Sequence, residues 1–185
     1  MLHVSGKLFS QRGYYGVSMR DIAEEMNFTK AALYYHFKSK DQLVEKLMSN
    51  SFSELKQELS NAVKNSKLPS SVLFNIIKTL LDFKINHPEI CLLMSLGVST
   101  DKKIPVLQLA TKLRIELMKF VRGLIKGANL TKKFTYRRLL VLTTTLVGFI
   151  LSPLNQEKNS DELADDFVKL LFPDSDAIAK TRQLI

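Results

Sequence analysis

The chain has 185 residues, 45% of them hydrophobic, which is enough for one large domain or two small ones with an ordinary core. Its net charge of +9 and pI of about 9.6 favour polyanionic partners, nucleic acid before an anionic membrane. The single cysteine, Cys91, excludes an internal disulfide and a thiolate zinc site and fits a reducing cytoplasm. With only 7 Gly and 5 Pro and no alternating β-branched runs, the composition predicts an all-α protein.

The first residues predict two helices joined by a bend. Residues 1–12 have helical apolar spacing, and Gly13 is a suitable left-handed stop. Ser18 and Asp21 then match the capping-box pattern, in which two side chains satisfy amides at a helix start. The helix that begins there has one apolar stripe, which we assign to the core and which consists of Met19, Ile22, Ala23 and Met26.

A third, short helix is expected after a tight turn. Asn27 tolerates the left-handed backbone of such a turn, and Thr29 is a good N-cap. Leu33 and Phe37 lie one turn apart and belong to the core, whereas a different face carries Lys30, Ala31, Tyr34 and Tyr35. A basic and aromatic face, held by a preceding helix, is what a major-groove recognition helix needs. Taken alone, the residues fit a solvated face equally well.

A long helix is predicted from Ser39, which forms a second capping box with Gln42, to the break at 65–69. It is too long to serve only a three-helix DNA reader, so we place a domain boundary near Met48. The sequence therefore predicts an N-terminal three-helix helix-turn-helix domain over 1–48. A C-terminal helical domain for effector binding and dimerisation is predicted over 49–185.

The C-terminal part predicts several more helices. Apolar spacing and stop signals place them from Ser70 to the pair His87-Pro88, over 90–96, from Asp101 to Gly127, over 136–151, and from Ser160 to Pro173. Residues 136–151 are apolar around most of the helix circumference, which indicates burial on more than one side. Sixteen residues with two arginines are too short and too charged to span a bilayer, so no membrane partner is expected.

The positive charge is not concentrated on the proposed reader. Residues 1–48 contain seven Lys/Arg and five Asp/Glu, a net charge of +2, and the remainder carries +7. Local geometry must therefore support the DNA-binding hypothesis, because total charge alone does not.

Several landmarks agree in spacing, without a gap, with a known family. They are Leu8-Phe9, Gly13-Tyr14, Ile22-Ala23, Leu33-Tyr34, His36-Phe37 and Ser39-Lys40-Asp41. With these landmarks the first quarter of the chain closely resembles the TetR family of one-component transcriptional regulators. The resemblance implies an all-helical homodimer, usually a repressor, that binds double-stranded operator DNA. It also implies a small-molecule effector and dimerisation through the last two helices.

The resemblance also implies roles for single residues. Arg20, Lys30 and Ala31 match positions that reach base edges, and Tyr34, Tyr35, His36 and Thr29 match positions that contact phosphates or nearby bases. Lys40 opens a helix whose dipole opposes its charge, so a phosphate partner explains it better than stability does. The expected DNA-binding set is Ser18, Arg20, Thr29, Lys30, Ala31, Tyr34, Tyr35, His36 and Lys40. Asn27 and Phe28 depart from the family's usual glycine and valine.

The C-terminal domain supplies the remaining expectations. Two apolar helices at the end of a chain can pair with their symmetry mates, and we favour this dimer over a large monomeric core. The expected interface consists of Leu142, Leu146, Phe149, Ile150, Leu163, Phe167 and Leu171. An apolar effector pocket is expected between helices, lined by Phe74, Ile77, Phe83, Met94, Met118 and Val121.

Catalysis is poorly supported by the sequence. The three histidines lie far apart, no Glu-x-x-His pair exists, and the glycines lack the pattern of a phosphate-binding loop, so neither metal nor cofactor is expected. A helical adaptor or membrane-surface protein is the alternative function. It would use the basic stretch Lys112, Arg114, Lys119, Arg122, Lys126, Lys132, Lys133, Arg137 and Arg138. We expect this stretch to be solvated or to pair with Asp161, Glu162, Asp165 and Asp166 rather than to bind a ligand.

Overall fold

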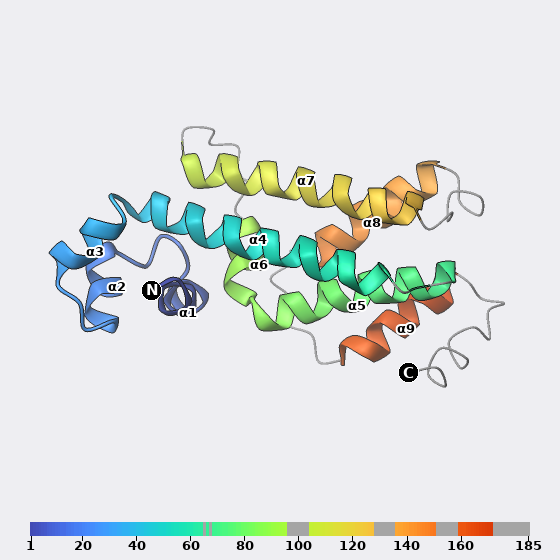
Figure 1. Ribbon diagram of the computed structural model, residues 1–185, viewed down its shortest axis with the longest axis horizontal. Helices are drawn as coiled ribbons and strands as arrows, with labels where there is room; N and C mark the ends of the chain where they lie inside the picture. Colours follow the sequence, from blue (N-terminus) through green and yellow to red (C-terminus); the bar gives the residue numbers. More distant parts are fainter. Residues whose placement is uncertain (65, 67, 96–103, 128–135, 151–158, 172–185) are drawn as a thin grey trace. The chain divides into compact units, whose positions relative to one another are not determined.

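The computed structural model describes residues 1–64, 66, 68–95, 104–127, 136–150 and 159–171. Within these ranges every regular element is an α-helix, which confirms the predicted all-α class (Figure 1). No helix in the described ranges combines the length and the apolar character needed to cross a bilayer. The helices are α1 (Leu2–Arg12), α2 (Met19–Glu25), α3 (Lys30–His36), α4 (Lys40–Lys64), α5 (Pro69–Asn86), α6 (Pro88–Ser95), α7 (Pro105–Gly127), α8 (Tyr136–Ile150) and α9 (Ser160–Leu171).

The local signals at the N-terminus fold as the sequence predicts. Helix α1 ends at Arg12 and is followed by Gly13, whose positive φ of 69° is one that glycine adopts readily, although its ψ of 170° differs from that of a left-handed helical cap. Asn27 also has a positive φ, 54°, in the turn between α2 and α3, where a short polar side chain tolerates that backbone. The capping box of Ser18 and Asp21 is present, and Thr29 caps α3. The structure thus confirms a helix, a tight turn and a second short helix.

Three predicted helix starts are wrong by a few residues. Helix α5 begins at Pro69 rather than being capped by Ser70, because proline lacks the amide that a first helical residue leaves unpaired. Helix α7 begins at Pro105, since Ile104 is not helical, whereas Asp101 lies outside the described residues. Ser160 is already inside α9, where the amide of Asp161 donates to Oδ1 of Asn159 at 3.0 Å. The predicted stop at Pro173 also lies outside the described residues.

Contacts divide the chain into two compact units, and each is discontinuous in sequence. The first unit contains the described parts of 1–54 and 87–115. In it, α6 packs on α1, and a Cβ atom added to Gly6 would lie 3.0 Å from Cγ of Glu89. The first unit thus combines the N-terminal helices with α6 and the beginning of α7.

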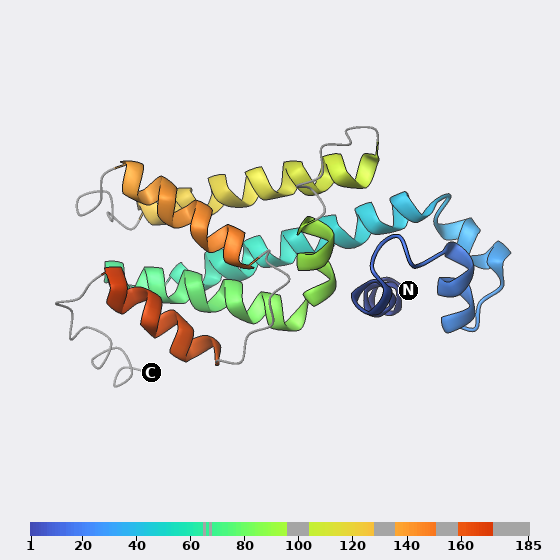
Figure 2. The ribbon, with the colours of Figure 1, turned by 180° about the vertical axis from the view of Figure 1, so that it is seen from behind.

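The second unit contains the described parts of 55–86 and 116–150 together with α9, and helices α5 and α9 lie side by side in it (Figures 1 and 2). Polar contacts join these two helices. The Ser160 hydroxyl donates to Oδ1 of Asp82 at 2.5 Å. Lys78 pairs with Asp82 and with Asp161, each at 3.2 Å. Asp161 thus pairs with Lys78 of α5.

Candidate nucleic-acid interface

Helix α3 separates a buried face from an exposed face. Leu33 is completely buried and holds the helix on its neighbours, and α2 is one of them. On the other face the side chains of Tyr34 and Tyr35 are 36% and 79% exposed. The remaining predicted contacts on this helix are also exposed, namely Lys30, Ala31 and His36. Leu33 thus holds α3 in place, and the other face of the helix presents polar and aromatic side chains.

Weak contacts within α3 orient this exposed surface. The ammonium of Lys30 lies 5.8 Å from the centre of the Tyr34 ring, and the rings of Tyr35 and His36 meet edge to face at 5.3 Å. Such exposed cation–π and aromatic pairs contribute little stability, so the side chains remain available to a partner. Lysine and tyrosine tips on a short helix can reach base edges and phosphate oxygens.

The start of α3 is fixed by Thr29. Its hydroxyl oxygen accepts a hydrogen bond from the amide of Ala32 at 3.1 Å. Thr29 itself is exposed, and Phe28 before it is 43% exposed despite being a large apolar residue. Phe28, which stands where the family usually has valine, is therefore an exposed aromatic residue next to the predicted contact Thr29.

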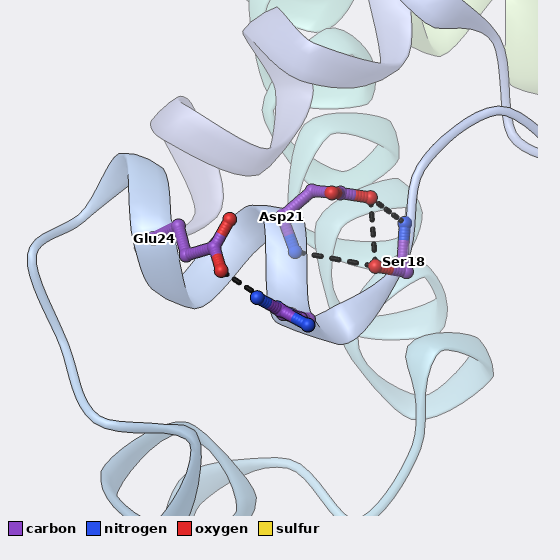
Figure 3. A network of polar contacts seen from close by, with 4 residues as sticks. Ser18, Asp21 and Glu24 are labelled. Atoms are coloured by element: carbon purple, nitrogen blue, oxygen red, sulfur yellow. Dashed lines mark hydrogen bonds and ion pairs between the residues drawn. The ribbon is translucent and has the colours of Figure 1, made fainter.

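Helix α2 begins with the capping box shown in Figure 3. The amide of Asp21 donates to the Ser18 hydroxyl oxygen at 3.2 Å, while the Ser18 amide and hydroxyl both donate to Oδ2 of Asp21 at 2.7 Å. These hydrogen bonds from Ser18 lower the pKa of the Asp21 carboxyl. Ser18 therefore has a structural role whether or not it also meets DNA.

Arg20 makes an ion pair on the surface. Its Nε lies 2.7 Å from Oε1 of Glu24, and the two side chains are 77% and 60% exposed. The hydrogen bond to Glu24, with the charge of that carboxylate, raises the pKa of the guanidinium. Exposed pairs of this type contribute little to stability, because solvent screens the two charges. A phosphate or guanine can therefore compete with Glu24 for Arg20 at small cost.

Lys40 has partners within the protein that the sequence reasoning did not anticipate. Its Nζ donates to the backbone carbonyl oxygens of Tyr14 and Val17, at 2.8 and 2.9 Å. Stability therefore does give a reason for a lysine at this position. The residues next to it, Tyr14 and Asp41, belong to the family landmarks, but the sequence alone indicates no role for them.

The residues expected to line an effector pocket have diverse surroundings. In the second unit Ile77, Phe83 and Val121 are buried, and Phe74 and Met118 are partly exposed. Met94 is buried in the first unit. An open groove of about 450 Å³ in the second unit is lined by other residues, which are Lys56, Glu116, Lys119, Phe120, Gly123 and Leu124. The effector pocket stays a prediction.

The expected dimer interface is described only in part. Leu146 is 1% exposed within its own unit, and Leu163 and Phe167 on α9 are partly exposed. The other predicted interface residues are Leu142, Phe149, Ile150 and Leu171, which the structure describes only as positions in α8 and α9. The part of the basic stretch on α7 is exposed at Lys112, Lys119 and Lys126, and Lys132 and Lys133 lie outside the described residues. The dimer interface stays a prediction as well.

Comparisons with known proteins agree with this site. A family model described as bacterial regulatory proteins, tetR family, matches residues 2–47. IcaR of Staphylococcus epidermidis, a negative transcriptional regulator of the biofilm operon icaADBC, is 41% identical over 46 residues, 25% of each chain. YttP of Bacillus subtilis, described as a probable HTH-type transcriptional regulator, is 28% identical over 99 residues, 52% of this chain and 48% of YttP. The matches thus span a quarter of IcaR and about half of YttP.

A solved structure extends the similarity over the whole fold. AibR, crystallised with isovaleryl coenzyme A and operator DNA, has a TM-score of 0.72 and 20% identity, with 93% of this chain and 96% of AibR covered. At this identity the likeness shows a shared fold. The family model adds a sequence signature over residues 2–47. The N-terminal quarter of the chain thus carries the signature of the tetR family of bacterial regulatory proteins, and the fold as a whole resembles that of AibR.

Proposed function

We propose that the chain is a DNA-binding transcriptional regulator, not an enzyme, and that it represses genes by binding a palindromic operator as a homodimer. The exposed face of α3 is the observation that carries this proposal. It presents a lysine and two tyrosines around one buried leucine, Leu33, and needs no such residues for packing. Under this proposal residues 1–48 form the DNA-binding domain, and 49–185 bind the effector and dimerise.

The DNA contacts are divided by their chemistry. Arg20 and Lys30 read guanine acceptors, and the methyl group of Ala31 meets a thymine methyl. Residues with polar side-chain ends bind the phosphates and thereby fix the position of the protein along the DNA. They are Ser18, Thr29, Tyr34, Tyr35 and His36. The ammonium of Lys40, the remaining predicted contact, already has partners within the protein.

Dimerisation and an effector complete the proposed regulator. A helix-turn-helix dimer reads two half-sites about 34–36 Å apart and gains affinity from both. Because residues 1–48 carry a net charge of only +2, one reader alone has a small electrostatic contribution to binding. The effector is a small apolar molecule that binds preferentially to the dimer conformation in which the two helix-turn-helix units are not positioned for the operator. The free energy of coupling between effector and DNA binding is about 1–3 kcal/mol. A solved relative in fold, AibR, was crystallised with both an acyl coenzyme A and operator DNA.

Selection of bound genomic fragments tests the proposal. We expect the recovered fragments to share a palindrome, and a single unrepeated half-site would contradict the homodimer. Binding of that site should weaken by about 1–3 kcal/mol in Lys30→Met, because a base contact is lost. Lys64→Met removes the same charge from the exposed end of α4 and is the matched control, expected to bind normally. Equal affinity of the wild type and Lys30→Met for this site would contradict the proposal that α3 reads the DNA bases.

A further inference from the structure

The ammonium of Lys40, the first residue of α4, is held by the turn between α1 and α2. Nζ donates to the carbonyl oxygens of Tyr14 at 2.8 Å and Val17 at 2.9 Å, and lies 4.1 Å from the centre of the Tyr14 ring. The Tyr14 hydroxyl in turn donates to Oδ1 of Asp41. We call this group of four residues the Lys40 clamp.

The clamp offsets the cost of a lysine at this end of a helix. The helix N-terminus carries partial positive charge, which disfavours a cation there. Burial in addition lowers the pKa of Lys40, although the neighbouring Asp41 charge opposes that shift. Two carbonyl dipoles and the face of an aromatic ring present negative charge density to the ammonium and stabilise it. Contacts within the first unit are therefore sufficient to explain why Lys40 is where it is.

The clamp connects the start of α4 to the start of α2. Val17, one of the two acceptors, directly precedes Ser18, the N-cap of α2, and α2 packs against α3. An ammonium has three donor hydrogens. Two of them are used by the carbonyl groups, and the Tyr14 ring occupies the space beside them.

We propose that Lys40 is a positioning residue, which sets the α1–α2 turn and thereby the orientation of α2 and α3, and is not a phosphate ligand. This inference rests on the proposed DNA-binding function. It assigns Lys40 a role through the backbone carbonyls of the turn, whereas the family resemblance implies a direct contact with DNA.

Lys40→Met keeps the length of the side chain and removes its ammonium. We expect the midpoint of thermal unfolding to fall by roughly 4–8 °C, because two charge-assisted hydrogen bonds are lost. Affinity for duplex DNA carrying the selected site should fall several-fold, measured where circular dichroism shows the variant to be folded. Lys46→Met removes an exposed charge from the same helix and should leave the midpoint unchanged.

The salt dependence of binding separates a positioning residue from a phosphate ligand. Each lost phosphate contact makes the slope of log K against log [salt] shallower by about 0.9. We expect Lys40→Met to bind more weakly with the slope of the wild type. A shallower slope with an unchanged midpoint would overturn the inference. Wild-type affinity in the folded variant would overturn it too, because Lys40 would then act on stability alone.

Lys40→Arg covers the case in which Lys40→Met does not fold. Arginine keeps the charge, but its planar fork does not converge on two carbonyl groups and a ring as a compact ammonium does. We therefore expect a lower midpoint and weaker binding despite the preserved charge, and wild-type values for both would overturn the inference. If the wild-type chain itself binds no DNA, the proposed function fails, while the midpoints of the variants still test the clamp.

Discussion

Replacing Ser18 by alanine should destabilise the start of α2 by a predictable amount. The variant loses two hydrogen bonds of the Ser18 hydroxyl, one accepted from the Asp21 amide at 3.2 Å and one donated to Oδ2 of Asp21 at 2.7 Å. It keeps the hydrogen bond from the backbone amide of residue 18 to Oδ2. Loss of an N-cap side chain costs about 1 kcal/mol. For a chain of 185 residues this free energy corresponds to a fall of roughly 2–4 °C in the unfolding midpoint.

The effect of this substitution should depend on pH. Hydrogen bonds from Ser18 lower the pKa of the Asp21 carboxyl in the folded protein below its value in the unfolded chain. A lowered carboxyl pKa contributes stability above the unfolded pKa, and this contribution disappears as the pH falls through the folded pKa. Because Ser18→Ala weakens the shift, the difference between wild type and variant should be complete near neutral pH. It should shrink below about pH 4.

Thermal denaturation followed by circular dichroism, at neutral pH and at acid pH, measures both effects. Ser18→Thr retains a capping hydroxyl and should lie close to the wild type. Ser53→Ala is the matched control, since that exposed hydroxyl only donates to the carbonyl of Ser49 within α4. An unchanged midpoint in Ser18→Ala, or an equal loss in Ser53→Ala, would refute the reasoning.

Three further substitutions test packing in the two units. Asn75→Leu removes the hydrogen bonds from Nδ2 to the Ala62 carbonyl and to the Ser66 hydroxyl, both 2.9 Å long. The free energy of unfolding, measured in urea, should fall by about 1–3 kcal/mol. An unchanged free energy would show that neither hydrogen bond contributes to stability. Gly6→Val places a branched side chain against Glu89 and should cost about 1–3 kcal/mol. Gly123→Ala has nothing within 4 Å of its new methyl group and should stabilise α7 by about 0.5–1 kcal/mol, so equal effects at the two glycines would contradict the packing argument.

The sequence predicts well those features that depend on neighbours in the chain. The Ser18 box joins residues three apart, and Gly13, Asn27 and Thr29 follow backbone preferences that operate within one turn. The face of α3 follows equally from helical periodicity around Leu33. These features together specify the geometry of the candidate DNA-binding helices, which is why their positions could be stated before the structure was known.

Features that depend on partners far away in the sequence could not be predicted from local patterns. Lys40 was interpreted from its helix position alone, but its acceptors lie 23 and 26 residues earlier in the chain. Serine is a common N-cap, but the Ser160 hydroxyl donates a hydrogen bond to Asp82. Asn159 is the residue whose side chain accepts from the helix, at the amide of Asp161. Apolar spacing shows which face of a helix is buried, but it does not show which helix covers that face. The packing of α6 on α1 could therefore not be predicted.

The pairing of α5 with α9 also has a consequence for the order in which the chain folds during synthesis. Ser160 follows its partner Asp82 by 78 residues, and Asp161 follows Lys78 by 83. At about 5–20 residues per second, a ribosome takes roughly 4–16 seconds to make the intervening segment. During that interval the side chains of Lys78 and Asp82 on α5 lack their partners on α9. The last described helix is therefore the one whose emergence completes these polar contacts of α5.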